Sequence, residues 1–211
     1  MAVASVAGRP PALVAGLVLG RAVTQATGLL EGASFSGGTD SPPGKGSVDV
    51  GLSRDMRKHH TQAVQMSVLA REATEDPEVR TLALDILLTQ QQAGQMCGWL
   101  SAWNVAQASP GPPIQDHDQT AATGAVSVPG MAGREDLDRL ARAERRQAER
   151  LYLQLMVHHH QGGVAMAEEA ALRAEEPQVR RLAKSIVGSQ TSQIAVLLSM
   201  LAARGGPADG S

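Results

Sequence analysis

The sequence predicts an all-α fold, an antiparallel four-helix bundle built from two duplicated helical hairpins. Three observations predict it: an aromatic content of only 2% in a chain of 211 residues, a repeat with a period of 100 residues, and apolar residues spaced by three and four within each repeat. With so few aromatic residues, Leu, Val, Ala and Met must build the interior, and that set suits helices better than sheets.

The N-terminal residues 1–31 predict a signal peptide or membrane anchor. Their apolar run, Ala12 to Gly20, lies between Arg9 and Arg21 and is shorter than the roughly 20 residues that span a bilayer. A cleaved signal and membrane attachment through the N-terminus are both open. Either places the protein outside the cytoplasm, secreted, periplasmic or anchored to the outer face of the membrane. Residues 32–51, rich in Gly, Ser and Pro, predict a flexible tether.

The folded part, residues 52–204, is internally duplicated. Without any gap, fourteen residues of the window 56–90 recur as the same residue type 100 positions later, far above the chance rate of roughly one in fifteen. The first copies are Met56, His59, His60, Val64, Met66, Ala70, Glu75, Pro77, Val79, Arg80, Leu82, Ala83, Ile86 and Gln90. The two halves are therefore copies of one unit.

Each unit is predicted to be a helical hairpin, over residues 52–108 and 134–204. Pro77 and Pro177 follow acidic residues and suit the start of the second helix of each hairpin. Residues 109–133, with four prolines, predict a linker, and 205–211 a tail. A short charged helix over 135–147 is expected to lead into the third long helix. Because one hairpin has too little core, the two are expected to pair face to face.

A stripe of His and Met lies on the first long helix of each hairpin. At about 100° per residue, Met56, His59, His60 and Met66 share one arc of roughly a third of the helix. The second copy repeats the arc with Met156, His159, His160 and Met166. We therefore expect these eight residues to form the metal site. Met66 and Met166 are the weaker candidates, because Met is also a common core residue.

Imidazole and thioether groups form a soft, neutral ligand set, which favours copper. A neutral set leaves the charge of the ion uncompensated, and this costs less for Cu(I) than for a divalent ion. Zinc bound by the histidines alone is the alternative. A di-iron site needs Glu-x-x-His, whereas Met56 precedes His59 and Met156 precedes His159 at that spacing.

Two glutamines are expected to lie level with the histidines. Counted from the hairpin turns, Gln90 is level with His60 and Gln190 with His160, so each could orient an imidazole or satisfy another polar group in the core. Cys97 is expected to be a small buried residue, although a thiolate ligand is the alternative. The spacing assigns no role to His117 or Met131 in the linker.

Composition excludes several classes of function. The formal charge of -2 gives no basic surface for nucleic acid, and a single cysteine allows neither an internal disulfide nor a Cys-rich zinc site. We identify no catalytic constellation, so the sequence does not predict an enzyme. Whether the domain forms a homo-oligomer is left open.

The chain resembles a bacterial family, the domain of unknown function 305, over about Leu52 to Arg204. Asp55 to Met66 (DMRKHHTQAVQM) is similar to its first signature, and Leu155 to Met166 (LMVHHHQGGVAM) to its second. Pro129-Gly130-Met131 is similar to the stretch that often precedes the second. The resemblance implies a ferritin-like helical bundle, usually exported, with some members linked to copper binding or copper tolerance.

One residue departs from the pattern of this family. Gly162-Gly163 stands in place of the commoner Gly-Ala, and an extra helical glycine costs about 1 kcal/mol. The favoured hypothesis is an extracytoplasmic copper-binding protein of copper handling or tolerance. The alternatives are a metal-free helical interaction module, with the stripe as core, and a ferritin-like metal oxidase.

Overall fold

A computed structural model describes residues 41–108 and 128–208, and the predicted leader at 1–31 lies outside them. The described residues are all-helical. Six α-helices and one 3₁₀ helix follow one another along the chain: α1 (Val48–Ala73), α2 (Pro77–Thr89), η1 (Gln90–Gln92), α3 (Ala93–Ala102), α4 (Arg134–Arg142), α5 (Arg145–Arg173) and α6 (Pro177–Ala203).

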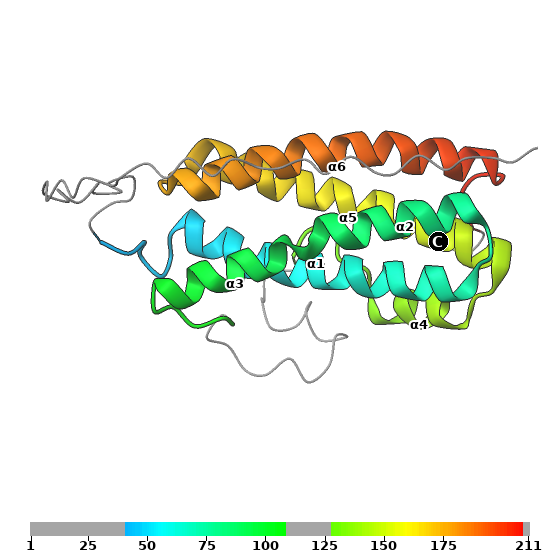
Figure 1. Ribbon diagram of the computed structural model, residues 1–211, viewed down its shortest axis with the longest axis horizontal. Helices are drawn as coiled ribbons and strands as arrows, with labels where there is room; N and C mark the ends of the chain where they lie inside the picture. Colours follow the sequence, from blue (N-terminus) through cyan, green and yellow to red (C-terminus); the bar gives the residue numbers. More distant parts are fainter. Residues whose placement is uncertain (1–40, 109–127, 209–211) are drawn as a thin grey trace, which may run out of the picture. The chain divides into compact units, whose positions relative to one another are not determined.

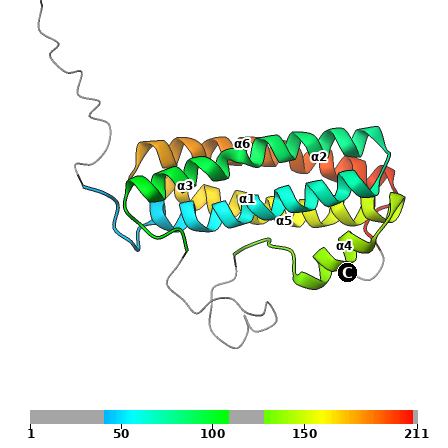
Figure 2. The ribbon, with the colours of Figure 1, turned by 60° about the horizontal axis from the view of Figure 1, so that its bottom comes forward.

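The long helical segments lie side by side along one axis (Figures 1 and 2). Helix α1 packs along α2, η1 and α3, which together form one rod, and α5 packs along α6. The two hairpins meet mainly where α1 lies against α5. The short helix α4 lies beside α1 and precedes α5 (Figure 2).

Helix α1 begins four residues earlier than the predicted start of the folded part at Leu52. The Ser47 hydroxyl accepts a hydrogen bond from the backbone N–H of Val50 at 3.3 Å, and Asp49 places a negative charge in the first turn. Both features stabilise a helix N-terminus. The last four residues of the predicted tether, Val48 to Gly51, therefore belong to the bundle.

Two buried carboxylates, 100 residues apart, each hold the turn of the opposite hairpin. Asp49 on α1 accepts hydrogen bonds from the backbone N–H groups of Glu175 and Glu176, at 3.1 and 2.9 Å, where α6 begins. Its counterpart Glu149 on α5 accepts one from the Thr74 hydroxyl at 2.5 Å, beside the start of α2. Asp49 thus pairs with two N–H groups at the start of α6, whereas Glu149 contacts the turn before α2 through the Thr74 side chain.

Arg204, at the end of α6, extends the second of these contacts. It is only 7% exposed and pairs with Glu149 at 3.1 Å and with Asp76 at 2.6 Å. Asp76 in turn caps α2, because its side chain accepts hydrogen bonds from the N–H groups of Glu78 and Val79. The ion pairs therefore lie at the end of the bundle, where water reaches part of the network.

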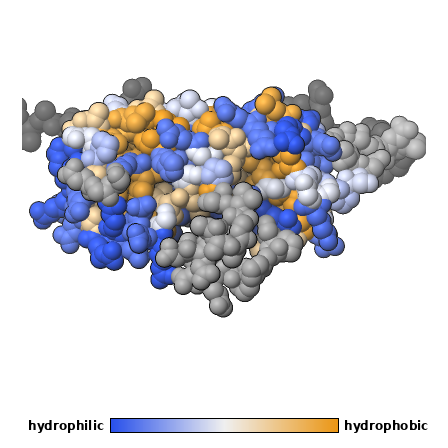
Figure 3. All heavy atoms as spheres, turned by 180° about the vertical axis from the view of Figure 1, so that it is seen from behind, coloured by the Kyte–Doolittle hydropathy of each residue, from blue (hydrophilic) through white to orange (hydrophobic). Residues whose placement is uncertain are grey.

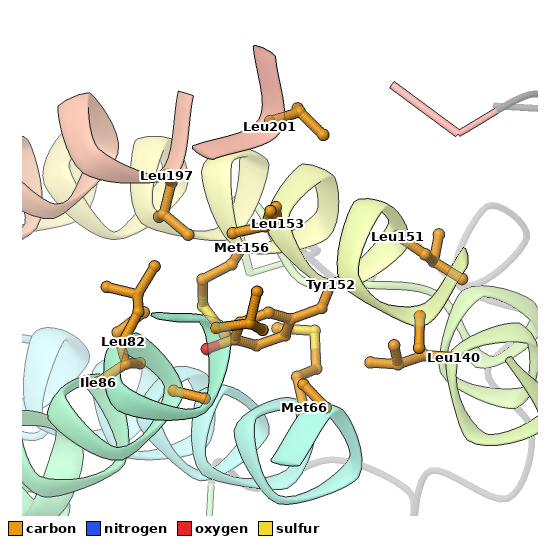
Figure 4. Close-up of a cluster of buried hydrophobic side chains, with 14 of the residues drawn as sticks. Met66, Leu82, Ile86, Leu140, Leu151, Tyr152, Leu153, Met156, Leu197 and Leu201 are labelled. Atoms are coloured by element: carbon orange, nitrogen blue, oxygen red, sulfur yellow. The ribbon is translucent and has the colours of Figure 1, made fainter. Parts of the chain in front are cut away.

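Helices α1 and α5 run antiparallel, with Ser67 opposite Tyr152 at one level and His59 opposite His159 at another. The Tyr152 hydroxyl and the Ser67 hydroxyl form a buried hydrogen bond of 3.0 Å. Tyr152 is fully buried in the larger hydrophobic cluster, where the side chains of Met66 and Met156 extend toward it (Figure 4).

The second helix of the first hairpin is interrupted, unlike its continuous counterpart α6. The 3₁₀ turn η1 breaks it at Gln90–Gln92. A 3₁₀ helix advances each residue by 120° rather than 100°, so the buried face shifts along the sequence. As a result Met96 is fully buried and Cys97 half-buried, whereas in α6 Leu197 is fully buried and Val196 is 47% exposed. The prediction that Cys97 is a buried residue is therefore wrong.

The last part of the predicted linker, residues 128–133, is fixed across α1 and α5. The Gln62 side chain donates to the Ala132 carbonyl at 2.9 Å and accepts from the Ala132 N–H at 2.8 Å. The backbone of Pro129 and Gly130 crosses α5 so closely at Gly162 that a Cβ there would overlap it. Gly162 is therefore required by the close approach of two backbones, at the cost in helix propensity that a mid-helix glycine carries.

Helix α6 leaves part of its apolar surface uncovered. Figure 3 shows hydrophobic and hydrophilic residues mixed on one face of the molecule. Large hydrophobic residues are exposed on several helices. They are Val68, Leu84, Leu88, Leu172, Val196 and Leu198. Within the described residues α6 is long and apolar enough to cross a membrane by length and composition, criteria that the core helix of a soluble protein also meets. After α6, the predicted tail turns back along α5, where Arg150 donates to the Gly206 carbonyl at 2.9 Å.

Replacing Gly162 by Ala is expected to lower the free energy of unfolding by about 1–3 kcal/mol, although Ala is the better helix former. The added methyl group would overlap the backbone of Pro129. Gly188→Ala in exposed α6 is the matched control: nothing lies within 4 Å of its new Cβ, so it should raise stability by about 1 kcal/mol. Urea unfolding of both variants measures the difference, and equal effects would show that the crossing does not constrain Gly162.

Candidate metal centre

The four predicted histidines lie in the middle of the bundle, where α1 faces α5. They form an α1 pair, His59 and His60, and an α5 pair, His159 and His160. All four side chains are at most 1% exposed. Adjacent side chains on a helix point about 100° apart. Both histidines of a pair are therefore buried only because other helices cover their helix on two sides. His158, on the opposite side of α5, is exposed, as its Lys58 counterpart suggests.

His59 and His159 stack on each other where the two helices cross. Their ring centroids are 3.6 Å apart and the ring planes are inclined by 26°. The Nε2 atom of His159 lies 3.1 Å from the His59 carbonyl oxygen. Because a carbonyl oxygen can only accept, Nε2 must carry the proton, and the Nδ1 atom of neutral His159 keeps its lone pair.

The other histidine of the α5 pair is held by a chain of hydrogen bonds from α6 to α2. The Nε2 atom of His160 lies 2.8 Å from Oε1 of Gln193, and the Gln193 amide donates to the carboxylate of Asp85 at 2.9 Å. Gln193 was missed by the sequence analysis because its counterpart, Ala93, is apolar. Its place on α6, three residues after Gln190 and so on the same face, was the available signal.

The remaining ring nitrogens have no hydrogen-bond partner among the described residues. These are both nitrogens of His59, both of His60, Nδ1 of His159 and Nδ1 of His160. Buried nitrogens without partners are unusual, and each costs about 1–3 kcal/mol. A neutral imidazole has one N–H and one lone pair, so the four rings together offer four lone pairs to a positively charged guest.

The two glutamines, each predicted either to orient an imidazole or to satisfy another polar group, lie in the core and form no hydrogen bond to a histidine among the described residues. Gln90 and Gln190 are both buried, and the Oε1 atom of each lacks a partner in the described structure. The end of Gln190 and the edge of the His59 ring share the space that a Cβ at Gly163 would occupy. Gln190 therefore lies next to His59, while Gln193 takes the expected place beside His160.

Burial keeps the four imidazoles neutral. It lowers the pKa of His59 to about 4, helped by the neighbouring His160 and opposed by the nearby backbone of His159 and Pro129. Burial, with the charges of His59 and His160, lowers the pKa of His60 to about 3. Burial also lowers the pKa of His160 to about 4, against the effect of its Gln193 bond.

The pKa of His159 is likewise lowered, first by burial and then by the other three histidines. At neutral pH all four rings are therefore unprotonated on one nitrogen, which is the form that binds metals.

The predicted methionines divide between two hydrophobic clusters. Met56 lies in one cluster with Met96, and Met66 and Met156 in the other with Tyr152, all four fully buried. Met56 and Met156 are one helical turn before His60 and His160, on the same face of each helix. Met166 is half-buried and lines a shallow surface pocket with Asp55 and Glu169.

The arrangement does not gather three charged or imidazole ligands around one point. Within residues 41–108 and 128–208, no group of three or more His, Cys, Asp and Glu side chains is placed to hold one ion. His60 and His160 lie 6.4 and 6.2 Å from their stacked neighbours, measured between ring centroids. Met131 is half-buried in the segment that crosses α5, and His117 lies outside the described residues.

These features define a class of protein: a helical domain with a buried, neutral cluster of histidines where the long helices α1 and α5 meet. The family model for the domain of unknown function DUF305 matches residues 49–201, and the chain belongs to this family. The chain is similar to a DUF305 protein from Streptomyces coelicolor, with 41% identity and a TM-score of 0.70 over 80% of this chain and 100% of that one.

Other solved structures are also similar. A DUF305 fragment from Deinococcus radiodurans shares 30% identity, with a TM-score of 0.65 over 77% of this chain and 99% of that one. CopM in its Cu(I)-bound form shares 27% identity, with a TM-score of 0.53 over 71% of this chain and 91% of that one. The Cu(II)-bound form of CopM shares 25% identity, with a TM-score of 0.58 over 74% of this chain and 96% of that one. No curated protein matches the chain.

The metal-free protein is expected to lose stability as the pH falls from about 6.5 toward 4. In this pH window the histidines of the unfolded chain, with the ordinary pKa of 6.5, bind protons, whereas the buried histidines of the folded chain do not. The free energy of unfolding therefore falls. Above pH 6.5 this effect is absent.

The variant His60→Leu should reduce the pH dependence by up to about 1.4 kcal/mol per pH unit. Denaturant unfolding of both proteins at pH 7.5, 6 and 5 measures it. A pH dependence that is the same in both proteins would contradict burial of His60 in the neutral form.

Proposed function

We propose that this protein binds copper at the crossing of α1 and α5. The observation that carries the proposal is the set of six buried ring nitrogens without hydrogen-bond partners. Similar proteins add support, because CopM has been solved with Cu(I) and with Cu(II). The neutral, soft donors favour Cu(I), and zinc bound by the histidines alone is the alternative metal.

The proposed ligands are His59, His60, His159 and His160, with Met56 and Met156 completing the set. The histidines do not gather three at a time around one point in the described residues, so sulfur completes a copper site of three or more donors, and zinc bound by the histidines alone would require the rings to move. Met56 and His60, four residues apart on one helix face, form one such pair, and Met156 with His160 forms the other. Met66 and Met166 are the weaker candidates, since the first packs with Tyr152 and the second reaches the surface.

Copper binding must move the central rings. A centroid separation of 3.6 Å between His59 and His159 leaves no space for an ion between them. An ion that engages Nδ1 of His159 therefore requires the stack to slide or open. We expect binding to stabilise the protein by linkage, since copper would bind only the folded arrangement.

The proposed role is copper handling or tolerance outside the cytoplasm, on an antiparallel four-helix bundle of the ferritin-like type. The support is the apolar run near the N-terminus and the Streptomyces coelicolor relative, which is provisionally described as secreted. No catalytic role is proposed, and an oxidase lacks support because the Glu-x-x-His pattern is missing from both histidine pairs.

A metal-free interaction module is the second candidate. It is favoured by the tight stacking of His59 on His159 and by the absence of a three-ligand group in the described part of the chain. In this alternative the histidines are core residues. The two candidates differ in one measurable property, the copper stoichiometry of the purified domain.

Purified protein is expected to bind Cu(I), and the double variant His59→Ala/His159→Ala to bind fewer ions per chain. Titration of Cu(I) against a chromophoric chelator, with metal content measured after gel filtration, gives the stoichiometry. Equal stoichiometry in the double variant and the wild type would sink the copper site proposed here.

The matched control is His158→Ala, which removes an exposed histidine from the same helix and should leave the number of bound ions unchanged. Circular dichroism of each variant shows whether it remains helical. Ferrous and cuprous oxidation assays on the same samples distinguish simple binding from oxidase activity.

A further inference from the structure

We propose that Gln193, oriented by Asp85, is a positioning residue that prepares His160 to receive the first ion, so that the two duplicated histidine pairs differ in affinity. This inference rests on the proposed function. It adds to that function an order of filling, in which the α5 pair is loaded before the α1 pair.

Asp85 fixes the orientation of the Gln193 amide. Its nitrogen lies 2.9 Å from a carboxylate oxygen of Asp85 and 3.4 Å from the Thr89 hydroxyl. A carboxylate can only accept, so the amide nitrogen must face Asp85 and the amide oxygen must face His160. Asp85, an exposed residue of α2, thereby fixes which end of the buried Gln193 side chain faces the imidazole of His160.

Gln193 in turn fixes the protonation of the His160 ring. Gln193 Oε1, 2.8 Å from Nε2 of His160, is an acceptor, so Nε2 carries the single proton of the neutral ring. The lone pair then resides on Nδ1, which is buried and has no partner in the described structure. His160 is thus held in one tautomer, with Nδ1 as its ligand atom before any metal arrives.

The first hairpin cannot repeat this chain. The counterparts of Gln193, Asp85 and Thr89 are Ala93, Ser185 and Ser189. Ala93 has no hydrogen-bonding side chain, and it lies just after the 3₁₀ turn that has no equivalent in α6. Both nitrogens of His60 consequently lack a partner, and nothing in the described structure selects its tautomer.

These differences predict unequal sites. His160 loses little rotational and tautomeric freedom when it binds an ion, because the hydrogen-bond chain has already restricted it. His60 must be ordered by the ion itself. Partners of this kind contribute about 10- to 100-fold to the metal affinity of a ligating histidine, so the α5 pair should bind first.

The direct test is the tautomer of His160 in metal-free protein, read from the ¹⁵N shifts of its two ring nitrogens by NMR at pH 7.5. The wild type should show a single Nε2–H form. Gln193→Leu, which removes the acceptor, should give a mixture of tautomers. Ser192→Ala, at an exposed position on the same helix, is the control and should leave the His160 signals unchanged.

The second test is Cu(I) affinity, measured by competition with a chelator. Gln193→Leu should weaken the tighter ion about 10- to 100-fold, and Asp85→Ala should weaken it less because Thr89 still contacts the amide. His160→Ala should abolish the tighter ion, and His60→Ala only the weaker one.

Two results would overturn the inference: an unchanged His160 tautomer in Gln193→Leu, or loss of the tighter ion in His60→Ala. A wild type that binds no copper would overturn the proposed function and the order of filling with it. The NMR comparison would then still decide whether Gln193 positions His160.

Discussion

The crossing of α1 and α5 at His59 and His159 is the contact on which the rest of the structure depends. The two rings stack at 3.6 Å, and a side chain of one helix bonds to the backbone of the other. This fixes which residues of the two hairpins lie opposite each other. The Ser67–Tyr152 hydrogen bond and the Asp49 contact with the turn before α6 both follow from the same antiparallel alignment. A shift of α1 by one residue would lose all three.

Buried ionic groups and buried neutral polar groups lie in different parts of the bundle. Ionic groups that are buried, such as Glu149 and Arg204, lie near the end of the bundle and bond to each other and to a helix-capping residue. The centre holds polar groups that burial keeps neutral, which avoids the several kcal/mol that a buried ion costs. The cost of the centre is instead a set of unpartnered nitrogens. Such an arrangement is stable as long as the rest of the core compensates, and it leaves donors that a cation can use.

Much of this could be predicted from the sequence, because the repeat and the helical spacing depend on local pattern alone. The histidines lie inside, as the arc on each helix indicates, and the hairpin turns begin α2 and α6 at Pro77 and Pro177. The 3₁₀ turn at Gln90 could not be predicted, since nothing in the apolar spacing marks it, and it moved the buried face from Cys97 to Met96.

Long-range polar contacts were the other part that the sequence did not reveal. Gln193 has no counterpart in the repeat, so comparison of the halves could not single it out. Asp49 and Glu149 differ in residue type and therefore did not count as a match, although they occupy equivalent places. Gly163 looked like a loss of helix propensity, but the ends of Gln190 and His59 occupy the space that a Cβ there would fill.

The reciprocal placement of Asp49 and Glu149 beside the turn of the opposite hairpin has a consequence for the origin of the chain. Contacts in which one copy gives to the other what it also receives are those of an isologous interface, the kind found in two-fold symmetric homodimers. In a single hairpin paired with its own twin, this carboxylate position of each copy would lie beside the turn of the other. Once two such hairpins are joined in one polypeptide, each can change in sequence independently of the other. At the centre of the domain this divergence is seen at Gln193, whose counterpart is Ala93.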